Sequence, residues 1–242
     1  MAVLKHILLA KEKSRKLLAW LLDPEKPFSE EILQSYLSLP DMIFVGGSTG
    51  SKMDTFVANL RQFTDKPIVL FPGNITQFSP NADALLFLSL LNAKTADMLI
   101  TPHVGVAKKV KESGIESIPM GYILLDGGRK SSVEIVSHAT PIPQSDVDKV
   151  VSTALAGQLL GKQLIYLEAG SGAVVPISTD VISAVSEQLE LPLIVGGGIR
   201  TPEAMWQAFD AGADVVVIGN HLEQYPDEIG DFVRVKCEKY GE

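Results

Sequence analysis

The chain is poor in cysteine. Its 242 residues contain one, Cys237, in the charged C-terminal segment. A single cysteine excludes an internal disulfide and a thiolate metal cluster, because each needs at least two cysteines. This composition fits a reducing compartment, and we therefore expect a cytoplasmic protein.

Runs of basic residues are also missing. The formal net charge is -8, and no block of five or six lysines and arginines occurs. The electrostatic pattern of a nucleic-acid-binding protein is absent, so we expect no nucleic-acid partner. The acidity argues against a large cationic membrane-docking face, although a local patch could exist within a negative total. An anionic substrate would be held by backbone amides, helix ends, a metal ion or a few placed cations.

Long apolar runs are missing as well. The longest, such as ALLFLSLL, are far shorter than the roughly 20 residues of a membrane-spanning helix. Near the N-terminus the apolar HILLA is short, precedes the charged KEKSRK and lacks the cleavage pattern of a signal peptide. We expect no integral membrane segment. The four histidines show no paired ligand spacing, which argues against a zinc or iron site.

Eight short apolar runs are present, and most end in glycine or a polar residue. Buried parallel strands read as continuous apolar runs, because helices cover the outer face of their sheet. We therefore predict eight strands, within residues 16–24, 42–48, 67–73, 84–90, 116–126, 163–170, 192–199 and 214–220.

Segments with helical spacing of apolar residues separate most of these runs. Ser29, Ser145 and Thr201 each precede acidic residues or a first-turn proline, which predicts that their hydroxyls cap helices. Alternating strands and helices predict a parallel sheet, and eight units in a chain near the typical length of about 250 residues favour a barrel. We predict one TIM (β/α)8-barrel domain over residues 1–242. The predicted helices lie within residues 30–39, 53–63, 95–113, 144–161, 178–190, 201–212 and 225–241.

The third connection is too short for a helix. Only residues 74–83 separate the third and fourth apolar runs, whereas a parallel crossover usually needs a dozen or more residues. We predict that the third helix is missing or replaced by an extended segment. The resulting gap could expose a groove for an elongated apolar ligand; the alternative, which spacing alone favours, is a locally irregular barrel.

Glycine-rich turns follow the last two predicted strands. Barrels of this kind carry their working residues at the C-terminal strand ends and often hold phosphate after strands seven and eight. Here those ends read GGGI (196–199) and IGN (218–220). Glycine lets the backbone approach an anion closely, and helix N-termini attract it. A phosphate site is the favoured interpretation over tight turns alone.

Carboxylates end two other predicted strands. Glu168 lies in YLEAGSGA (166–173), where it could orient or deprotonate a substrate hydroxyl, or could simply pair with a structural cation. Asp23 ends the first strand, and Ser48 follows the second. A carboxylate and a hydroxyl could hold Mg²⁺ with substrate phosphates, although each residue alone is more often a turn former or a helix cap.

Aromatic residues are spread over the predicted strands and loops. They could line an apolar channel, although at such positions they are more often plain core. The candidates are Phe71, Phe78, Phe87, Tyr122 and Tyr166.

Several motifs together resemble one family. LLDPEK, FVGGST, VLFPGN, YLEAGSGA, IVGGGIRTPE and ADVVVIGN occur in this order from the first strand to the last and are similar to the geranylgeranylglyceryl phosphate synthase family. Bacterial heptaprenylglyceryl phosphate synthases belong to the same superfamily. The resemblance implies a prenyltransferase that transfers the prenyl group of a polyprenyl diphosphate to the C3 hydroxyl of sn-glycerol 1-phosphate, giving an ether lipid precursor.

The resemblance also implies residue roles. Asp23 and Ser48 match the magnesium positions, and Glu168 would hold the glycerol hydroxyls and help to remove the proton, so that Glu168 and Asp23 are the catalytic candidates. The family's magnesium dependence makes Mg²⁺ the expected cofactor, and a homo-oligomer is expected. The positions that match glycerol phosphate contacts are Tyr166, Leu167, Glu168, Ala169, Gly170, Ser171, Gly172, Gly197, Gly198, Gly219 and Asn220.

One position departs from the heptaprenyl branch. Leu21 and Leu22 precede Asp23, where that branch resembles Lys-Leu-Asp and uses the lysine on phosphate. The difference favours a geranylgeranyl donor and leaves open whether Lys26 or Arg200 supplies the cation. Two alternatives remain: another phosphate-binding barrel, such as an isomerase or lyase acting on a phosphorylated metabolite, or a non-catalytic phosphometabolite carrier.

Overall fold

Eight parallel strands form a closed barrel. The computed structural model describes residues 2–26, 28–47, 52–74, 77–95 and 99–241. Each strand pairs with its neighbours in chain order, and β1 closes the barrel by pairing with β8. All eight predicted apolar runs contain a strand, which confirms the predicted barrel. The strands are β1 (Leu17–Leu22), β2 (Met42–Val45), β3 (Ile68–Leu70), β4 (Ala84–Leu90), β5 (Glu116–Leu124), β6 (Leu164–Glu168), β7 (Leu193–Gly196) and β8 (Val215–Ile218).

The strands are apolar throughout because both of their faces are buried. In β6, Leu164 and Tyr166 belong to the cluster that fills the barrel, whereas Ile165 and Leu167 pack in the outer cluster beneath the helices. Successive side chains of a strand point to opposite faces. In a strand that is buried on both faces, polar and apolar residues therefore do not alternate.

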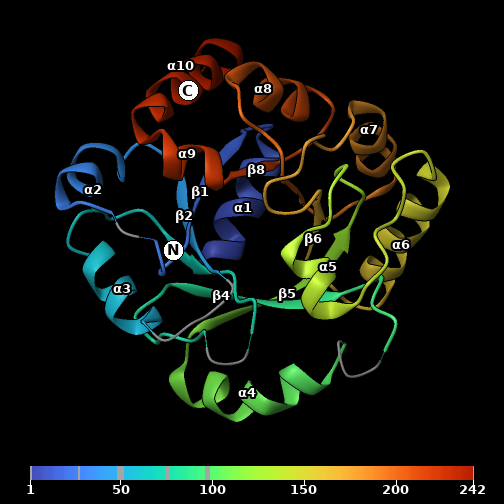
Figure 1. Cartoon of the computed structure of the whole chain (residues 1–242), viewed down its shortest axis with the longest axis horizontal. Helices are drawn as coiled ribbons and strands as arrows, with labels where there is room; N and C mark the ends of the chain where they lie inside the picture. Colours follow the sequence, from blue (N-terminus) through green and yellow to red (C-terminus); the bar gives the residue numbers. More distant parts are fainter. Residues whose placement is uncertain (1, 27, 48–51, 75–76, 96–98, 242) are drawn as a thin grey trace.

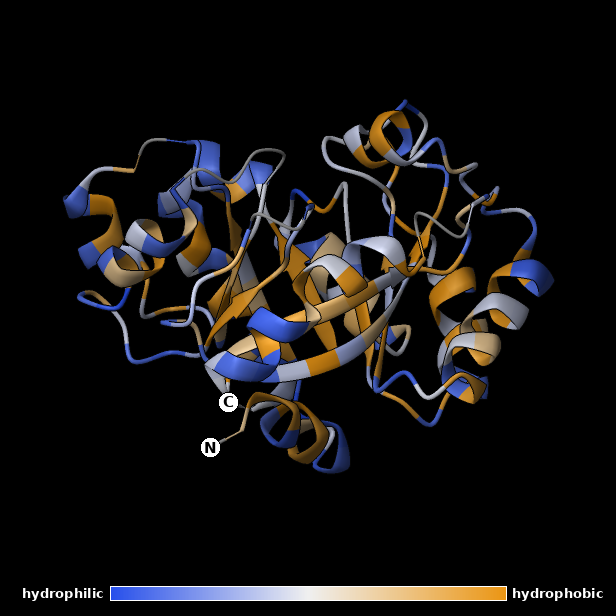
Figure 2. Cartoon of the chain, turned by 90° about the horizontal axis from the view of Figure 1, so that it is seen from below, coloured by the Kyte–Doolittle hydropathy of each residue, from blue (hydrophilic) through white to orange (hydrophobic). Residues whose placement is uncertain are grey.

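Helices surround the barrel (Figure 1). Seen from the side, their apolar parts turn toward the strands, which are themselves almost wholly apolar in the interior (Figure 2). The described helices are α1 (Val3–Glu12), α2 (Glu30–Tyr36), α3 (Met53–Leu60), α4 (Thr101–Ser113), α5 (Ser132–Ser137), α6 (Val147–Leu159), α7 (Thr179–Gln188), α8 (Pro202–Asp210), α9 (Asn220–Gln224), the 3₁₀ turn Pro226–Glu228, and α10 (Ile229–Tyr240).

Side-chain caps begin several of these helices. The side chains of Ser29 and Thr201 each accept a hydrogen bond from the backbone amide three residues later, as predicted. The prediction for Ser145 was wrong, because the helix begins one residue later and Asp146 accepts the bond from the Lys149 amide. Aspartate and serine are equally good N-caps, so the sequence could not distinguish these two adjacent residues, and the residue at which the helix begins makes Asp146 the cap.

Helix α1 covers the N-terminal end of the barrel and was not predicted. Its residues Val3, Ile7 and Ala10 are buried in the cluster that fills the barrel. The carboxylate of Glu116, at the start of β5, accepts hydrogen bonds from the first-turn amides of Val3 (2.5 Å) and Leu4 (3.1 Å). This end of the barrel is therefore closed, and access to the interior lies at the other end.

The third connection contains no helix in its described residues, 71–74 and 77–83. Ser79 and Asn81 fix it to α3 by hydrogen bonds to the Asp54 carboxylate (2.6 and 2.9 Å). The prediction of a missing third helix is confirmed for these residues, and the outer ring is open between α3 and α4. Within the described chain, no helix is long and apolar enough to cross a membrane.

Candidate active site

A cavity of about 720 Å³ opens at the C-terminal ends of the strands. It lies where sequence reasoning placed the site, and its volume is typical of a small-molecule pocket. Nine predicted site residues line it: Asp23, Tyr166, Glu168, Ser171, Gly172, Gly197, Gly198, Gly219 and Asn220.

The remaining predicted residues lie elsewhere. The side chain of Leu167 packs in the outer hydrophobic cluster, and Ala169 is buried there as well. Gly170 contributes through its backbone, since its amide binds the Glu168 carboxylate. Ser48 lies outside the described residues.

The glycine turns form the polar end of the cavity. Gly172, Gly197 and Gly198 all have positive φ angles (72°, 85° and 76°), a conformation that residues with a side chain rarely adopt. A Cβ atom on Gly197 would lie 2.4 Å from Oε1 of Glu168 and 2.9 Å from the amide nitrogens of Ala169 and Gly170. The loops after β6 and β7 are thus in direct contact, and only glycine fits between them.

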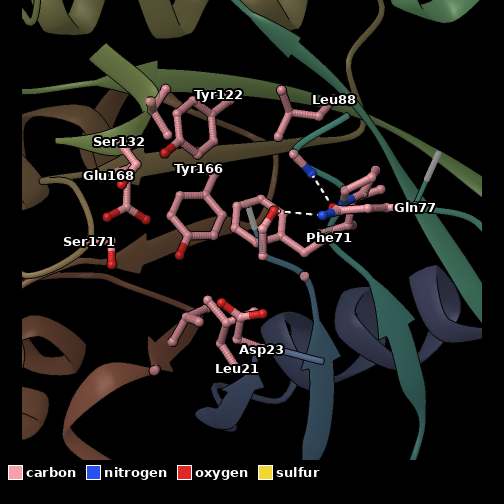
Figure 3. A pocket seen from close by; sticks show the side chains of 18 of the residues that line it. Leu21, Asp23, Phe71, Gln77, Leu88, Tyr122, Ser132, Tyr166, Glu168 and Ser171 are labelled. Atoms are coloured by element: carbon pink, nitrogen blue, oxygen red, sulfur yellow. Dashed lines mark hydrogen bonds between the residues drawn. The ribbon is translucent and has the colours of Figure 1, made fainter. Parts of the chain in front are cut away.

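Glu168 is a buried carboxylate with an unusual pKa. Its residue is 7% exposed, and Oε1 accepts a hydrogen bond from the Gly170 amide at 2.7 Å. Burial raises the pKa of Glu168 to about 7, although the hydrogen bonds from Gly170 and from the Tyr166 hydroxyl oppose the shift. A carboxylate with this pKa is suited to accept a proton near neutral pH. Figure 3 shows Glu168 beside Tyr166 and Ser171, with Asp23 across the cavity near Leu21.

Three aromatic rings form the floor between the two carboxylates. Tyr166 stacks on Phe71, with 5.2 Å between ring centroids and 6° between planes, and Tyr122 lies 5.4 Å from Tyr166. A Cβ atom on Gly196 would lie 2.1 Å from the Tyr166 hydroxyl oxygen, so this glycine makes room for the ring. The sequence favoured core positions for these aromatics, but the structure shows that they also line the cavity.

Asp23 ends β1 on the other side of the cavity. Its Oδ1 accepts the amide of Glu25 at 3.0 Å, and the backbone of Gly47 packs directly against the carboxylate. The Asp23 amide donates to Oε1 of Glu223 at 2.9 Å. Glu223 also binds the ammonium group of Lys26, and burial raises the pKa of this glutamate. The loop after β1 is thus fastened to α9.

The donor set at Asp23 fits magnesium. Among the described residues, no group of three His, Cys, Asp or Glu side chains forms a metal cluster. Mg²⁺ needs none, since it is usually held by one or two carboxylates, water and substrate phosphates. Asp23 supplies a hard oxygen ligand at the cavity wall.

Cations reach the polar end from three loops. Lys26 donates to Oδ1 of Asn220 at 3.2 Å, and Asn220 donates in turn to the Ser171 hydroxyl at 3.1 Å. Arg200 donates to the Ala173 carbonyl at 2.5 Å. Arg129, which the sequence did not single out, lies near Gly172. Both cations left open by the sequence, Lys26 and Arg200, line the cavity.

The other end of the cavity is apolar and reaches the gap in the helix ring. It passes Phe71 and Phe78 of the third connection and then side chains of β4 and α4. Phe87 lies edge-on to His103, with 4.5 Å between ring centroids. The groove that the short third connection suggested is therefore present. The apolar lining of this arm includes Phe78, Leu85, Phe87, Leu88, Pro102, Val106 and Val110.

Enzymes of the (β/α)8-barrel class carry their active sites at this end of the barrel, and many of them hold a phosphate at the turns after the seventh and eighth strands. Comparison with known families is more specific. The chain belongs to the PcrB family, whose model matches residues 10–236.

Relatives and solved structures agree with this assignment. The chain is 45% identical to geranylgeranylglyceryl phosphate synthase of Zunongwangia profunda over 226 residues, which cover 91% of this chain and 97% of that protein. It is 43% identical to the synthase of Spirosoma linguale over 223 residues, covering 90% of each. The crystal structure of (S)-3-O-geranylgeranylglyceryl phosphate synthase from Thermoplasma acidophilum in complex with sn-glycerol-1-phosphate superposes with a TM-score of 0.91. That chain is 36% identical, with 98% of this chain and 99% of that chain covered.

Proposed function

We propose that this protein transfers a prenyl group from a polyprenyl diphosphate to the C3 hydroxyl of sn-glycerol 1-phosphate. The observation that carries the proposal is the buried Glu168, with a pKa of about 7, in one cavity with the glycine turns and Asp23. The names of the relatives and the substrate bound by the Thermoplasma acidophilum enzyme support it.

Glycerol phosphate binds at the polar end. The turns at Gly172, Gly197 and Gly198 hold its phosphate, and Glu168 accepts a hydrogen bond from the C3 hydroxyl. As the C3 oxygen forms its bond to the first carbon of the prenyl group, the bond from that carbon to the diphosphate breaks and Glu168 takes the hydroxyl proton. Diphosphate leaves with the bonding electrons.

The diphosphate binds on the Asp23 side. We propose that Asp23 and, by the family resemblance, Ser48 would hold Mg²⁺, whose charge would stabilise the leaving diphosphate. Lys26 lies beside Asp23, although its ammonium group is paired with Glu223 and Asn220. Asp23 fixes the position of the diphosphate relative to Glu168, which aligns the hydroxyl with the reacting carbon.

The prenyl tail occupies the apolar arm that ends in the helix gap. We propose a geranylgeranyl donor, which is supported by the names of the relatives and by Leu21 in place of a lysine. We also propose a homo-oligomer in the cytoplasm; the single cysteine fits a reducing compartment.

The test is incubation of the purified protein with sn-glycerol 1-phosphate, magnesium and a series of prenyl diphosphates of increasing length, with product masses recorded. A prenylglyceryl phosphate is expected, and the preferred donor reports chain length. Product formation that is independent of magnesium would remove the metal from the proposal. If no ether forms with any donor, the reaction is wrong, and phosphorylated metabolites should be screened for isomerase or lyase turnover or for binding alone.

A further inference from the structure

Large apolar side chains are exposed at one end of the barrel. Exposed fractions reach 71% at Val104, 68% at Val136 and 61% at Val174. Seven of these side chains come from the connections after β4, β5 and β6, and we call them the rim patch. The rim patch consists of Leu99, Ile100, Val104, Ile135, Val136, Val174 and Val175.

Barrel topology places the rim patch on the face that holds the active site. A connection that leaves the C-terminal end of a parallel strand begins at that end of the barrel. Leu99 and Ile100 precede α4, α5 lies in the connection from β5 to β6, and Val174 follows β6. In Figure 2, α5 stands clear of the barrel at the upper edge, right of centre, with apolar colour on its ribbon.

The rim patch is continuous with the apolar arm of the cavity. Val136 is both exposed and part of the cavity lining. On α4, Pro102 and Val106 line the cavity, whereas Val104 between them points to solvent. Apolar surface therefore continues from the inside of the site to the outside. Continuous exposed apolar surface around a site is unusual where the protein contacts only water, and such surface commonly marks an interaction site.

The charged side chains near the rim patch fit docking on a lipid surface. Residues 169–178, which carry Val174 and Val175, include no charged side chain. Arg129 and Lys130 are exposed just before α5. Apolar side chains flanked by arginine and lysine are typical of segments that lie in the interface of a bilayer, where the cations meet anionic headgroups. Residues 126–138, which include α5, carry two acidic and two basic side chains, so this part of the surface is neutral although the whole chain has a net charge of -8.

We propose that the rim patch docks the protein on a lipid bilayer, with the side chains of α4, α5 and the loop after β6 inserted among the acyl chains. The inference rests on the proposed function, because a polyprenyl diphosphate has its hydrocarbon tail in a membrane. Docking lets the tail slide from the bilayer into the apolar arm without crossing water, and lets the product return.

Two pairs of substitutions test the docking. Val104→Ser with Ile135→Ser removes apolar surface from α4 and α5, and Val174→Ser with Val175→Ser removes it from the loop after β6. None of these four side chains lines the cavity. The matched control is Leu159→Ser with Leu160→Ser, since these side chains are 85% and 75% exposed but lie at the end of α6 that leads into β6, at the opposite end of the barrel.

The first measurement is sedimentation with vesicles of phosphatidylcholine and phosphatidylglycerol. The unaltered protein and the Leu159/Leu160 variant should bind, and each rim variant should bind at least about tenfold more weakly. The second measurement is turnover. Rim variants should lose kcat/KM for geranylgeranyl diphosphate embedded in vesicles but keep it for a short, water-soluble prenyl diphosphate.

These readouts separate the docking from the reaction. Turnover of the soluble donor reports the proposed function alone, so its absence in the unaltered protein would indicate failure of the reaction rather than of the docking. The docking is overturned if the unaltered protein does not bind vesicles, or if rim and control variants bind equally. It is also overturned if light scattering shows that the rim variants break an oligomer, since the rim patch would then join copies of this chain.

Discussion

The side-chain amide of Gln77 donates a hydrogen bond to the carbonyl oxygen of Gly47 at 2.7 Å, across 30 residues of sequence. The oxygen of the same amide accepts the Gly73 amide at 2.6 Å (Figure 3). Gln77 is 1% exposed and belongs to the third connection, where other barrels carry a helix. The segment that replaces the helix thus fastens the loop after β2, whose Gly47 packs against Asp23, to the loop after β3.

We predict that Gln77→Leu weakens divalent metal binding about tenfold. Leucine has a similar size but leaves the Gly47 carbonyl and the Gly73 amide without this partner, which costs about 1–3 kcal/mol for each buried group. The loop then no longer holds its position beside Asp23. Calorimetric titration with Mn²⁺ in the presence of inorganic diphosphate, without prenyl substrate, measures the effect independently of turnover.

Gln144→Leu is the matched control. Gln144 also joins two loops, donating to the Asp126 carbonyl (2.8 Å) and accepting the Ser178 amide (2.7 Å), but its contacts belong to the loops after β5 and β6. Both variants should have a lower melting temperature, and only Gln77→Leu should lose metal affinity. Equal metal affinity in the two variants would mean that Gln77 stabilises the fold and nothing more.

Glu168 should set the pH dependence of turnover. A base must be deprotonated to accept the hydroxyl proton, and the pKa of Glu168 is about 7. We therefore expect kcat of the unaltered protein to rise with pH and to level off above about pH 7. In Glu168→Gln, turnover should fall at least about a hundredfold, within the usual range for loss of a general base, and the rise near neutrality should disappear. The pH profile of kcat, measured for both proteins at saturating substrate, tests this prediction.

The same carboxylate should destabilise the protein at high pH. Its pKa is raised from 4.5 to about 7, so the folded state binds the proton more tightly than the unfolded state. Protonated Glu168 therefore contributes favourably to the free energy of unfolding. This contribution is complete below pH 4.5 and is lost as the pH rises to about 7. The full difference is about 3 kcal/mol, at about 1.36 kcal/mol per pKa unit. The free energy of unfolding of Glu168→Gln, relative to that of the unaltered protein, should therefore increase by up to this amount from about pH 4 to about pH 8. Urea unfolding of both proteins at both pH values measures the difference.

The barrel and the polar end of the site could be predicted because both leave local patterns. A strand buried on both faces must be apolar throughout, and turns that approach an anion must contain glycine, as at Gly197 and Gly198. Each pattern is contained within a few consecutive residues. Reading eight such segments in order was sufficient to place the cavity.

The contacts that support the site could not be predicted in this way. Glu223 meets Lys26 across 197 residues, and Gln77 meets Gly47 across 30, so neither contact has a local signature. Helix α5 has six residues, too few to show a helical period. In α1 the buried residues Val3, Ile7 and Ala10 do have helical spacing, but only the barrel shows what this helix covers.

Asp23→Asn should abolish metal-dependent turnover while leaving the fold intact. The amide keeps the shape of the side chain, and its oxygen can still accept the Glu25 amide, but it has no charge to hold a divalent ion. We expect a loss of at least about a hundredfold in turnover, with glycerol 1-phosphate binding retained because the glycine turns are untouched. Calorimetry with glycerol 1-phosphate, next to the turnover assay, measures both. Full activity would remove Asp23 from the mechanism.

Gly197→Ala should destroy glycerol phosphate binding. The new methyl group would lie 2.4 Å from Oε1 of Glu168, so the loops after β6 and β7 must separate, and a φ of 85° is strained for alanine. Gly161→Ala is the control, because Gly161 has a φ of 82° but no atom within 4 Å of the added Cβ. Both variants bear a similar backbone strain, of order 1–2 kcal/mol, and should show a lower melting temperature. Calorimetry with glycerol 1-phosphate should find affinity lost only in Gly197→Ala; equal affinities would mean that the turn does not hold the phosphate.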